Sequence, residues 1–318
     1  MAKILVFGGA GYSGSVLVQD LLEKNHGVTV FDTFWFGDWF EPDIEGLTKI
    51  QGDIRNPDSY PNEYFDAVIH LANIANDPGV ELNPLLSWEV NVLASHLIAD
   101  WAVRHGIPHL IFASSGSVYG VKEEEKVTED LSLVPISYYN KTKMVAERVF
   151  LSYADQMKVH IIRPATICGV SPRMRFDLTV NILTKQAVHN GEITVFGGEQ
   201  IRPNIHIEDI SRVYQHFLHN PQLDTGVYNA GFENLSVNDI AQRISERTGA
   251  KIIITESNDP RSYRLDSSKL LATGFGPRKT TADAIEDVEM YCMNREKSSR
   301  REWMTVPMMN NLGLDRDA

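Results

Sequence analysis

The stretch Ile4-Leu5-Val6-Phe7-Gly8-Gly9-Ala10-Gly11-Tyr12-Ser13-Gly14 decides the fold that this sequence predicts. A short apolar run leads directly into glycines, and apolar residues at helical spacing continue to Leu22. The apolar run Val28 to Phe31 is typical of a second strand, which ends on Asp32. This order of strand, glycine-rich turn, helix and strand predicts a βαβ unit of a parallel sheet.

The same alternation continues along the chain. Strands are expected at Leu47 to Gln51, Ala67 to Leu71, His109 to Ala113 and Val159 to Ile162, and helices at about Leu85 to His105 and Ser137 to Asp155. Alternating strands and helices predict an α/β fold, a Rossmann-type doubly wound parallel sheet.

After Arg163-Pro164 the sequence becomes polar and basic, from Ser171 to Asp177, and we divide the chain into two regions and a tail. We expect residues 1–165 to form the dinucleotide-binding domain, with returning pieces near 204–230. A smaller, interleaved α/β substrate lobe is expected in residues 166–203 and 231–294. Residues 295–318 are predicted to be a tail or a partner-contacting arm.

Composition excludes several classes of protein. With 318 residues, 43% of them hydrophobic, the chain can bury a sizeable core. A formal net charge of -12 argues against a nucleic-acid partner. The two cysteines, Cys168 and Cys292, form no disulfide framework, and no Cys/His spacing predicts a metal site. The short apolar N-terminus lacks the length of a signal peptide or membrane span, so a cytoplasmic protein is expected.

The glycines at 8, 11 and 14 follow a strand and open a helix, which is the context of a dinucleotide site. Without side chains there, backbone amides and the helix dipole can approach a pyrophosphate. Asp32 can accept hydrogen bonds from ribose hydroxyls, and no Arg directly follows it, so the expected cofactor is NAD. A plain βα turn and a turn-forming Asp are the alternatives.

Tyr139 and Lys143 stand four residues apart at the start of an expected helix, where they share one face. A nearby ammonium group would lower the phenol pKa and let Tyr139 act as an acid or base near neutral pH. A solvated Lys beside a half-buried Tyr is the plain alternative. Trp35, Phe36 and Trp39 follow Asp32, and we favour packing or a lid over base stacking for them.

Seven motifs together resemble the extended short-chain dehydrogenase/reductase family, and in particular its NAD-dependent nucleotide-sugar epimerases and dehydratases. In chain order they are Gly8 to Gly14, Gly52-Asp53-Ile54-Arg55, His70-Leu71-Ala72-Asn73, Ser114 to Gly120, Tyr139 with Lys143, Arg163-Pro164-Ala165, and Arg202 to Asp209. The resemblance covers about residues 1 to 290.

The resemblance implies roles for individual residues. Tyr139 resembles the catalytic base, Lys143 the residue that holds the nicotinamide ribose, and Ser115 the hydroxyl that binds the same sugar hydroxyl. The cofactor residues implied are Gly8, Gly11, Tyr12, Ser13, Gly14, Asp32, Asp53, Ile54, Leu71, Ala72, Asn91, Tyr139 and Lys143. The family also implies a homodimer paired through the helices at 85–105 and 137–155, with Val149 and Phe150 on the outer face.

The substrate is expected to be a nucleoside-diphosphate sugar bound in the second lobe, as in carbohydrate biosynthesis. Guanidinium groups suit the geometry of a diphosphate, although a solvated Arg is the alternative for several of them. The candidate substrate residues are Arg173, Arg175, Asn181, Arg202 and Arg261.

Departures from the family pattern narrow the expected reaction. Gly116 and Ser117 stand where 4,6-dehydratases carry an acid pair, and Ser117 also stands where some epimerases carry a Cys. Arg202-Pro203-Asn204 replaces the more usual Arg-Asp-Phe or Arg-Asp-Tyr. We therefore predict C4 epimerisation through a transient 4-keto sugar. A one-way 4-dehydrogenase or 4-ketoreductase, and more distantly a non-catalytic dinucleotide-binding scaffold, are the alternatives.

Overall fold

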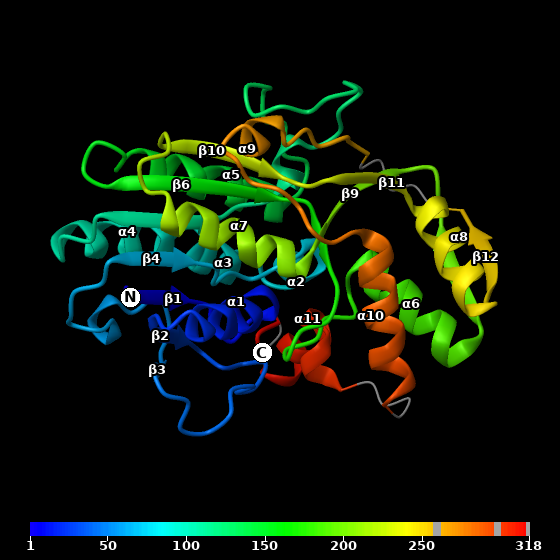
Figure 1. Ribbon diagram of the computed structural model, residues 1–318, viewed down its shortest axis with the longest axis horizontal. Helices are drawn as coiled ribbons and strands as arrows, with labels where there is room; N and C mark the ends of the chain where they lie inside the picture. Colours follow the sequence, from blue (N-terminus) through cyan, green and yellow to red (C-terminus); the bar gives the residue numbers. More distant parts are fainter. Residues whose placement is uncertain (257–261, 296–299, 316–318) are drawn as a thin grey trace.

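A seven-stranded parallel sheet, in the order β10-β6-β5-β4-β1-β2-β3, forms the centre of the molecule (Figure 1). The computed structural model describes residues 1–256, 262–295 and 300–315. The sheet strands are β1 (Lys3–Phe7), β2 (Gly27–Asp32), β3 (Leu47–Gln51), β4 (Ala67–His70), β5 (His109–Ala113), β6 (Lys158–Pro164) and β10 (Gly226–Ala230). All neighbouring strands run parallel, as the apolar runs of the sequence predict.

Helices cover both faces of this sheet, because successive strand residues point to opposite sides. On one side Ile4 and Val6 of β1 join the core under α1 (Tyr12–Glu23) and α7 (Ile207–His219). On the other side Leu5 and Phe7 join the core under α4 (Ala94–Arg104) and α5 (Tyr138–Leu151). The doubly wound α/β fold predicted from the sequence is therefore confirmed.

The single helix expected at 85–105 is instead broken into pieces. The helical pieces here are α2 (Asp77–Leu82), α3 (Pro84–Trp88), a π-helical turn η2 (Glu89–Leu93) and α4. Asn83 caps α3 by accepting a hydrogen bond from the Leu86 amide. Apolar periodicity alone cannot detect the extra residue of a π-helical turn, which is why the break was not predicted.

A second lobe, visible on the right of Figure 1, has its own apolar core between helices and two small sheets. Its sheets contain β7 (Thr166–Cys168), β9 (Ile201–His206) and β11 (Glu233–Ser236), and β8 (Glu192–Phe196) and β12 (Lys251–Thr255). Its helices are α6 (Thr179–Asn190), α8 (Val237–Thr248) and α10 (Thr281–Met293). The sequence analysis missed α10, although Thr280 and Asp283 form a capping box at its start.

Short elements complete the described chain. They are the 3-10 turns η1 (Pro57–Ser59), η3 (Gly116–Tyr119) and η4 (Arg301–Trp303), and the helices α9 (Ser268–Leu271) and α11 (Thr305–Asn311). Among the residues described, no helix is long and apolar enough to cross a membrane.

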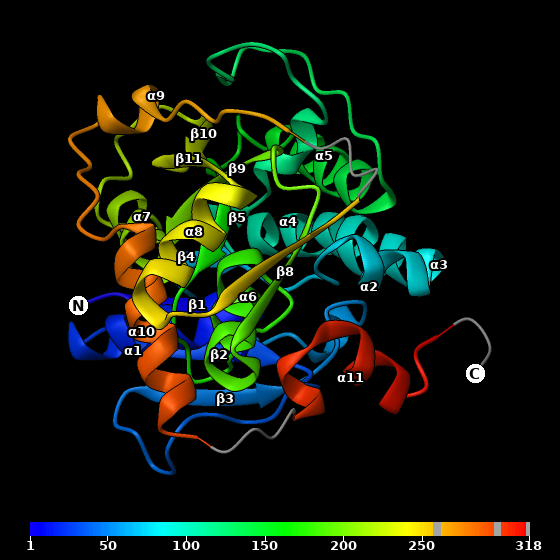
Figure 2. The same cartoon turned by 90° about the vertical axis from the view of Figure 1, so that its right-hand side faces the viewer.

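Residues 300–315, which we call the C-terminal segment, correct the expectation of a tail. The Phe176 amide donates to the Trp303 carbonyl at 3.0 Å, and the Thr305 amide donates to Asp177 at 3.2 Å. Trp303 and Met309 are buried, and α11 packs beside α2 (Figure 2). Because its apolar side chains find partners within the chain, this segment folds back onto the protein.

Candidate active site

The glycine-rich turn between β1 and α1 is shaped by close backbone contacts. Gly8 has a positive φ of 82°, and a Cβ atom there would lie 2.4 Å from the Ala72 nitrogen. A Cβ atom on Gly14 would lie 2.4 Å from the Gly8 carbonyl oxygen. Side chains are therefore excluded at both positions, and Gly11, Tyr12 and Ser13 at the start of α1 line a cavity beside the turn.

Two adjoining cavities beside this turn, of about 170 and 110 Å³, form what we call the cofactor cavity. It follows the carboxyl ends of the central strands, where doubly wound sheets bind ligands. The predicted cofactor residues that line it are Gly8, Gly11, Tyr12, Ser13, Asp32, Asp53, Ile54, Leu71, Ala72, Tyr139 and Lys143. Trp35 and Phe36 line it too, which places this aromatic pair at the cofactor cavity.

Asp32 connects the second strand to the glycine-rich turn. Its carboxylate accepts hydrogen bonds from the Ala10 amide at 3.0 Å and the Phe34 amide at 2.9 Å. Burial raises the pKa of Asp32, and these amides partly oppose that rise. Asp32 thus orders the loops that frame the cavity in addition to facing it.

Two predicted cofactor residues have supporting positions and do not line the cavity. Gly14 packs against the turn, as its contact with Gly8 requires. Asn91 accepts from the Ile74 amide at 2.8 Å, and its own amide donates to the Ile74 carbonyl and to Thr142. The expectation that Asn91 lines the channel is therefore corrected: its amide is used to hold Ile74, which does line the cavity.

Tyr139 lies where the cofactor cavity meets a larger cavity of about 490 Å³, the substrate cavity, and it lines both. The Ser137 hydroxyl caps α5 by accepting from the Asn140 amide, so Tyr139 sits in the first turn of the helix. Lys143 follows one turn later, with its Nζ 6.0 Å from the Tyr139 ring centroid. The Lys143 ammonium donates to the Ala113 carbonyl at 2.7 Å.

Burial dominates the pKa values of this pair. It raises the pKa of Tyr139 to about 12, against the opposing effects of Arg175 and a hydrogen bond with Ser115. Burial lowers the pKa of Lys143 to about 7, which the charge of Glu147 partly opposes. The expected lowering of the Tyr139 pKa by Lys143 is therefore corrected for the cofactor-free protein: desolvation outweighs the charges nearby.

A chain of hydroxyl groups lines the substrate cavity beside Tyr139. The hydroxyls of Ser115 and Ser117 lie 2.8 Å apart, and Ser117 donates to Asn140 at 2.7 Å. Asp77, the first residue of α2, also lines the cavity, and its charge acts on the pKa of Tyr139. Sequence analysis missed Asp77 because nothing in its local sequence distinguishes it from a helix-starting Asp.

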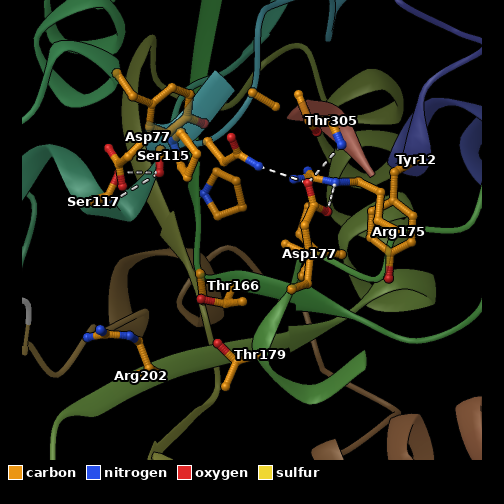
Figure 3. A pocket seen from close by; sticks show the side chains of 18 of the residues that line it. Tyr12, Asp77, Ser115, Ser117, Thr166, Arg175, Asp177, Thr179, Arg202 and Thr305 are labelled. Atoms are coloured by element: carbon orange, nitrogen blue, oxygen red, sulfur yellow. Dashed lines mark hydrogen bonds and ion pairs between the residues drawn. The ribbon is translucent and has the colours of Figure 1, made fainter. Parts of the chain in front are cut away.

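The far part of the substrate cavity is formed by the second lobe and the C-terminal segment. Figure 3 shows the labelled residues Ser115, Ser117 and Asp77 together, and Arg175, Asp177 and Thr305 together, with Arg202, Thr166 and Thr179 farther along. Arg175 donates to Asp177 at 2.8 Å, and Asn76 also donates to Asp177. Cations and amides around one carboxylate make this wall polar and ordered.

Among the described residues, two predicted substrate residues, Asn181 and Arg173, do not line this cavity. Asn181 is fully buried, and its amide bonds to Gly169, to the Arg175 carbonyl and to the Tyr12 hydroxyl. These bonds hold its side chain in place, and its contact with the diphosphate stays a prediction. Arg173 lines the cofactor cavity and not the substrate cavity. Arg261 lies outside the described residues.

Comparison with known proteins identifies the class of this chain. The model of the NAD dependent epimerase/dehydratase family matches residues 4–231, and the chain belongs to this family. It is 30% identical to the "Uncharacterized UDP-glucose epimerase YtcB" of Bacillus subtilis (strain 168), over 84% of this chain and 90% of that protein. It is 27% identical to a "UDP-glucose 4-epimerase" of Lactobacillus helveticus, over 89% of this chain and 94% of that protein.

A solved structure agrees with the family assignment. The structure described as "MoeE5 in complex with UDP-glucuronic acid and NAD" aligns with a TM-score of 0.81 at 27% identity. The alignment covers 92% of this chain and 100% of that one. NAD is the cofactor of the family, and the residues present fit it: the cavity holds a side-chain-free turn at a helix N-terminus and the Asp32 carboxylate.

Proposed function

We propose that this enzyme interconverts the C4 epimers of a nucleoside-diphosphate sugar. One observation carries the proposal: Tyr139 lines both the cofactor cavity and the substrate cavity. A side chain at that junction can reach a sugar hydroxyl whose carbon faces the nicotinamide. The names of the relatives support uridine diphosphate sugars as the first substrates to test.

The chain's own residues supply proton handling and orientation. Tyr139 would take the proton of the C4 hydroxyl and return it after the 4-keto sugar has turned over. Ser115, held by Ser117, would hydrogen-bond the same hydroxyl. The glycine-rich turn and Asp32 would hold NAD, which would supply reversible hydride transfer at C4. No acid pair follows Ser115, which disfavours 4,6-dehydration.

Substrate anchoring is proposed for the cations farther along the cavity. Arg175 and Arg202 line the substrate cavity, and guanidinium groups suit a diphosphate. Arg261 stays a predicted substrate residue from the sequence alone. A cavity of about 490 Å³ lies within the size range of small-molecule sites.

A substrate screen followed by NMR tests this function. The purified full-length chain with NAD is incubated separately with UDP-, GDP-, CDP- and dTDP-hexoses. We expect one substrate to give an equilibrium mixture of C4 epimers with no net NADH. Accumulation of a ketone with stoichiometric NADH would instead establish a 4-dehydrogenase, and no turnover of any sugar would contradict the proposal.

Tyr139→Phe removes only the hydroxyl group on which the mechanism depends. We expect epimerisation to fall by about 100-fold or more, since general acid–base catalysis contributes that much. NAD binding should change little. Tyr138→Phe is the matched control, because Tyr138 is the adjacent, exposed residue and lines neither cavity. Wild-type turnover by Tyr139→Phe would rule out this mechanism.

We further propose a homodimer paired through α4, η2 and α5. Two large apolar side chains support this surface: Leu93, in η2, is 52% exposed, and Leu85, in α3, is 72% exposed. Val149 of α5 is only half-buried within the chain. Phe150 corrects the sequence expectation, because it is fully buried against Phe112 in the core.

A further inference from the structure

Arg173 is a buried cation for which the described residues supply no ion-pair partner. It is 2% exposed, it lines the cofactor cavity, and its Nε has no hydrogen-bond partner. Asp32 and Asp177 act on it electrostatically, but neither forms an ion pair with it. Burial and the neighbouring Arg175 lower the pKa of Arg173.

Other buried arginines of this chain show how such a group is normally satisfied. Arg163 is 3% exposed and donates to both oxygens of Glu147, at 2.8 and 2.7 Å. Arg175 donates to Asp177. An unpaired buried charge is costly, and proteins rarely keep one without a partner. Arg173 is therefore arranged for an anion that enters the cavity with a ligand.

The position of Arg173 indicates which anion this is. The Ser171 hydroxyl donates to the Tyr12 carbonyl at 2.7 Å and lies 2.9 Å from the Ser15 hydroxyl. These bonds fix the loop before Arg173 against the first turn of α1. Arg173 and the N-terminal amides of α1 thus face one cavity, where the diphosphate of a dinucleotide binds.

Phe36 also lines this cavity and is in contact with Arg173. The guanidinium carbon of Arg173 lies 3.8 Å from the Phe36 ring centroid. Phe36 belongs to a turn in which the Gly37 amide bonds to the Phe34 carbonyl, and the Trp39 indole donates to the Phe36 carbonyl. One partner comes from the loop after β2 and the other from the loop after β7.

We propose that Arg173 binds the diphosphate of NAD and that the Arg173–Phe36 contact closes over the cofactor and retards its release. This inference rests on the NAD site and is independent of the proposed C4 chemistry. It gives the loop after β7 a part in holding the cofactor, and it gives the aromatic loop after Asp32 the role of a strap.

NAD binding by full-length Arg173 variants tests the proposal. We expect Arg173→Met to raise the Kd for NAD, measured calorimetrically after cofactor removal, by about 10- to 100-fold, and the NAD that copurifies to fall in parallel. The Kd of Arg173→Lys should lie between those of the wild type and Arg173→Met, because lysine keeps the positive charge but lacks the paired N–H donors of the guanidinium group. Arg295→Met is the matched control, since Arg295 stacks on Tyr291 at 4.3 Å and lines neither cavity.

Thermal unfolding separates this role from a structural one. Without NAD, Arg173→Met should be as stable as the wild type or more stable, because a buried unpaired charge is removed. Its stabilisation by saturating NAD should be smaller. Phe36→Leu should raise the NAD dissociation rate several-fold with little change in the association rate. An unchanged Kd for NAD, or a raised KM for the sugar nucleotide alone, would overturn the proposal.

Discussion

Lys143 is a buried amine whose pKa lies near 7, below its ordinary value of 10.5. Between these two values the unfolded chain binds a proton that the folded chain does not. Stability therefore rises with pH across this window and is lost as pH falls through 7. The residue predicted to hold the nicotinamide ribose is thus kept buried at a cost in stability.

Lys143→Met should reveal that cost. For the cofactor-free protein we expect a Tm higher than that of the wild type at pH 7, by on the order of several degrees, and a smaller advantage at pH 9. Thermal unfolding followed by circular dichroism at both pH values measures it. Lys141→Met, at an exposed neighbouring position, should show no such pH dependence. If Lys143→Met raised the Tm equally at pH 7 and pH 9, the lowered pKa of Lys143 would be contradicted.

Glu147 holds together a group of buried polar side chains next to the candidate catalytic residues. It accepts from Arg163 through both oxygens and from the Ser114 hydroxyl at 2.5 Å. Arg163 also donates to the Tyr119 hydroxyl at 2.7 Å. Since Ser114 precedes Ser115, these side chains support the strand end that presents the proposed catalytic hydroxyl of Ser115.

Removing both members of the Arg163–Glu147 ion pair should cost less stability than the two single removals added together. Glu147→Leu leaves the Arg163 charge buried and unpaired, which we expect to cost about 3–5 kcal/mol. The double variant Glu147→Leu with Arg163→Met should lose clearly less than the sum of the two single losses. Urea unfolding of the four proteins gives the coupling energy. Additive losses would mean that the ion pair contributes nothing.

The element that sequence patterns described least well is the C-terminal segment. Its helix α11 contributes Thr305 to both cavities, and Met304, Val306 and Pro307 line the substrate cavity. The Thr305 amide is bonded to Asp177, which in turn holds Arg175. A segment without sequence motifs therefore forms one wall of the site.

Thr305→Pro isolates the hydrogen bond that docks this segment. Thr305 is the first residue of α11 and follows an extended Met304, so proline is compatible with the local backbone. We expect the KM for the sugar nucleotide to rise by about 5- to 10-fold, because the hydrogen bond from the Thr305 amide to the Asp177 carboxylate is lost. Thr305→Ala keeps the amide and should have a smaller effect. Equal effects of both variants would show that the side chain, not the amide, matters.

For the whole molecule, the proposed dimer surface makes the clearest prediction. Leu93→Asp should place a charge in the interface and convert a dimer into a monomer, as light scattering after gel filtration would report. Ile254→Asp is the matched control, because Ile254 is 62% exposed but lies on β12 of the second lobe. A monomeric wild type, or a dimer that survives Leu93→Asp, would contradict this surface. The cytoplasmic location expected from the sequence stays a prediction.

Local patterns in the sequence predicted much of the fold. β3 and β5 lie at the expected residues, and the glycine-rich turn opens α1 as its spacing requires. Tyr139, Lys143 and Ser115 were found through short motifs, and the structure places all three at the cavities. These features depend on neighbours within one or two turns of chain, which a sequence displays directly.

Only the tertiary structure decided which distant residues share a site. Asp77, which was not predicted, lines the substrate cavity. Arg173, which was predicted to bind the substrate, lines the cofactor cavity, and the C-terminal segment, which was expected to be a tail, lines both cavities. The sequence by itself determined the alternation of strands and helices, the glycine-rich turn and the candidate catalytic side chains, because local spacing encodes them. The contacts Arg173–Phe36 and Thr305–Asp177 join residues more than a hundred positions apart, and such contacts exist only once the elements between them have packed.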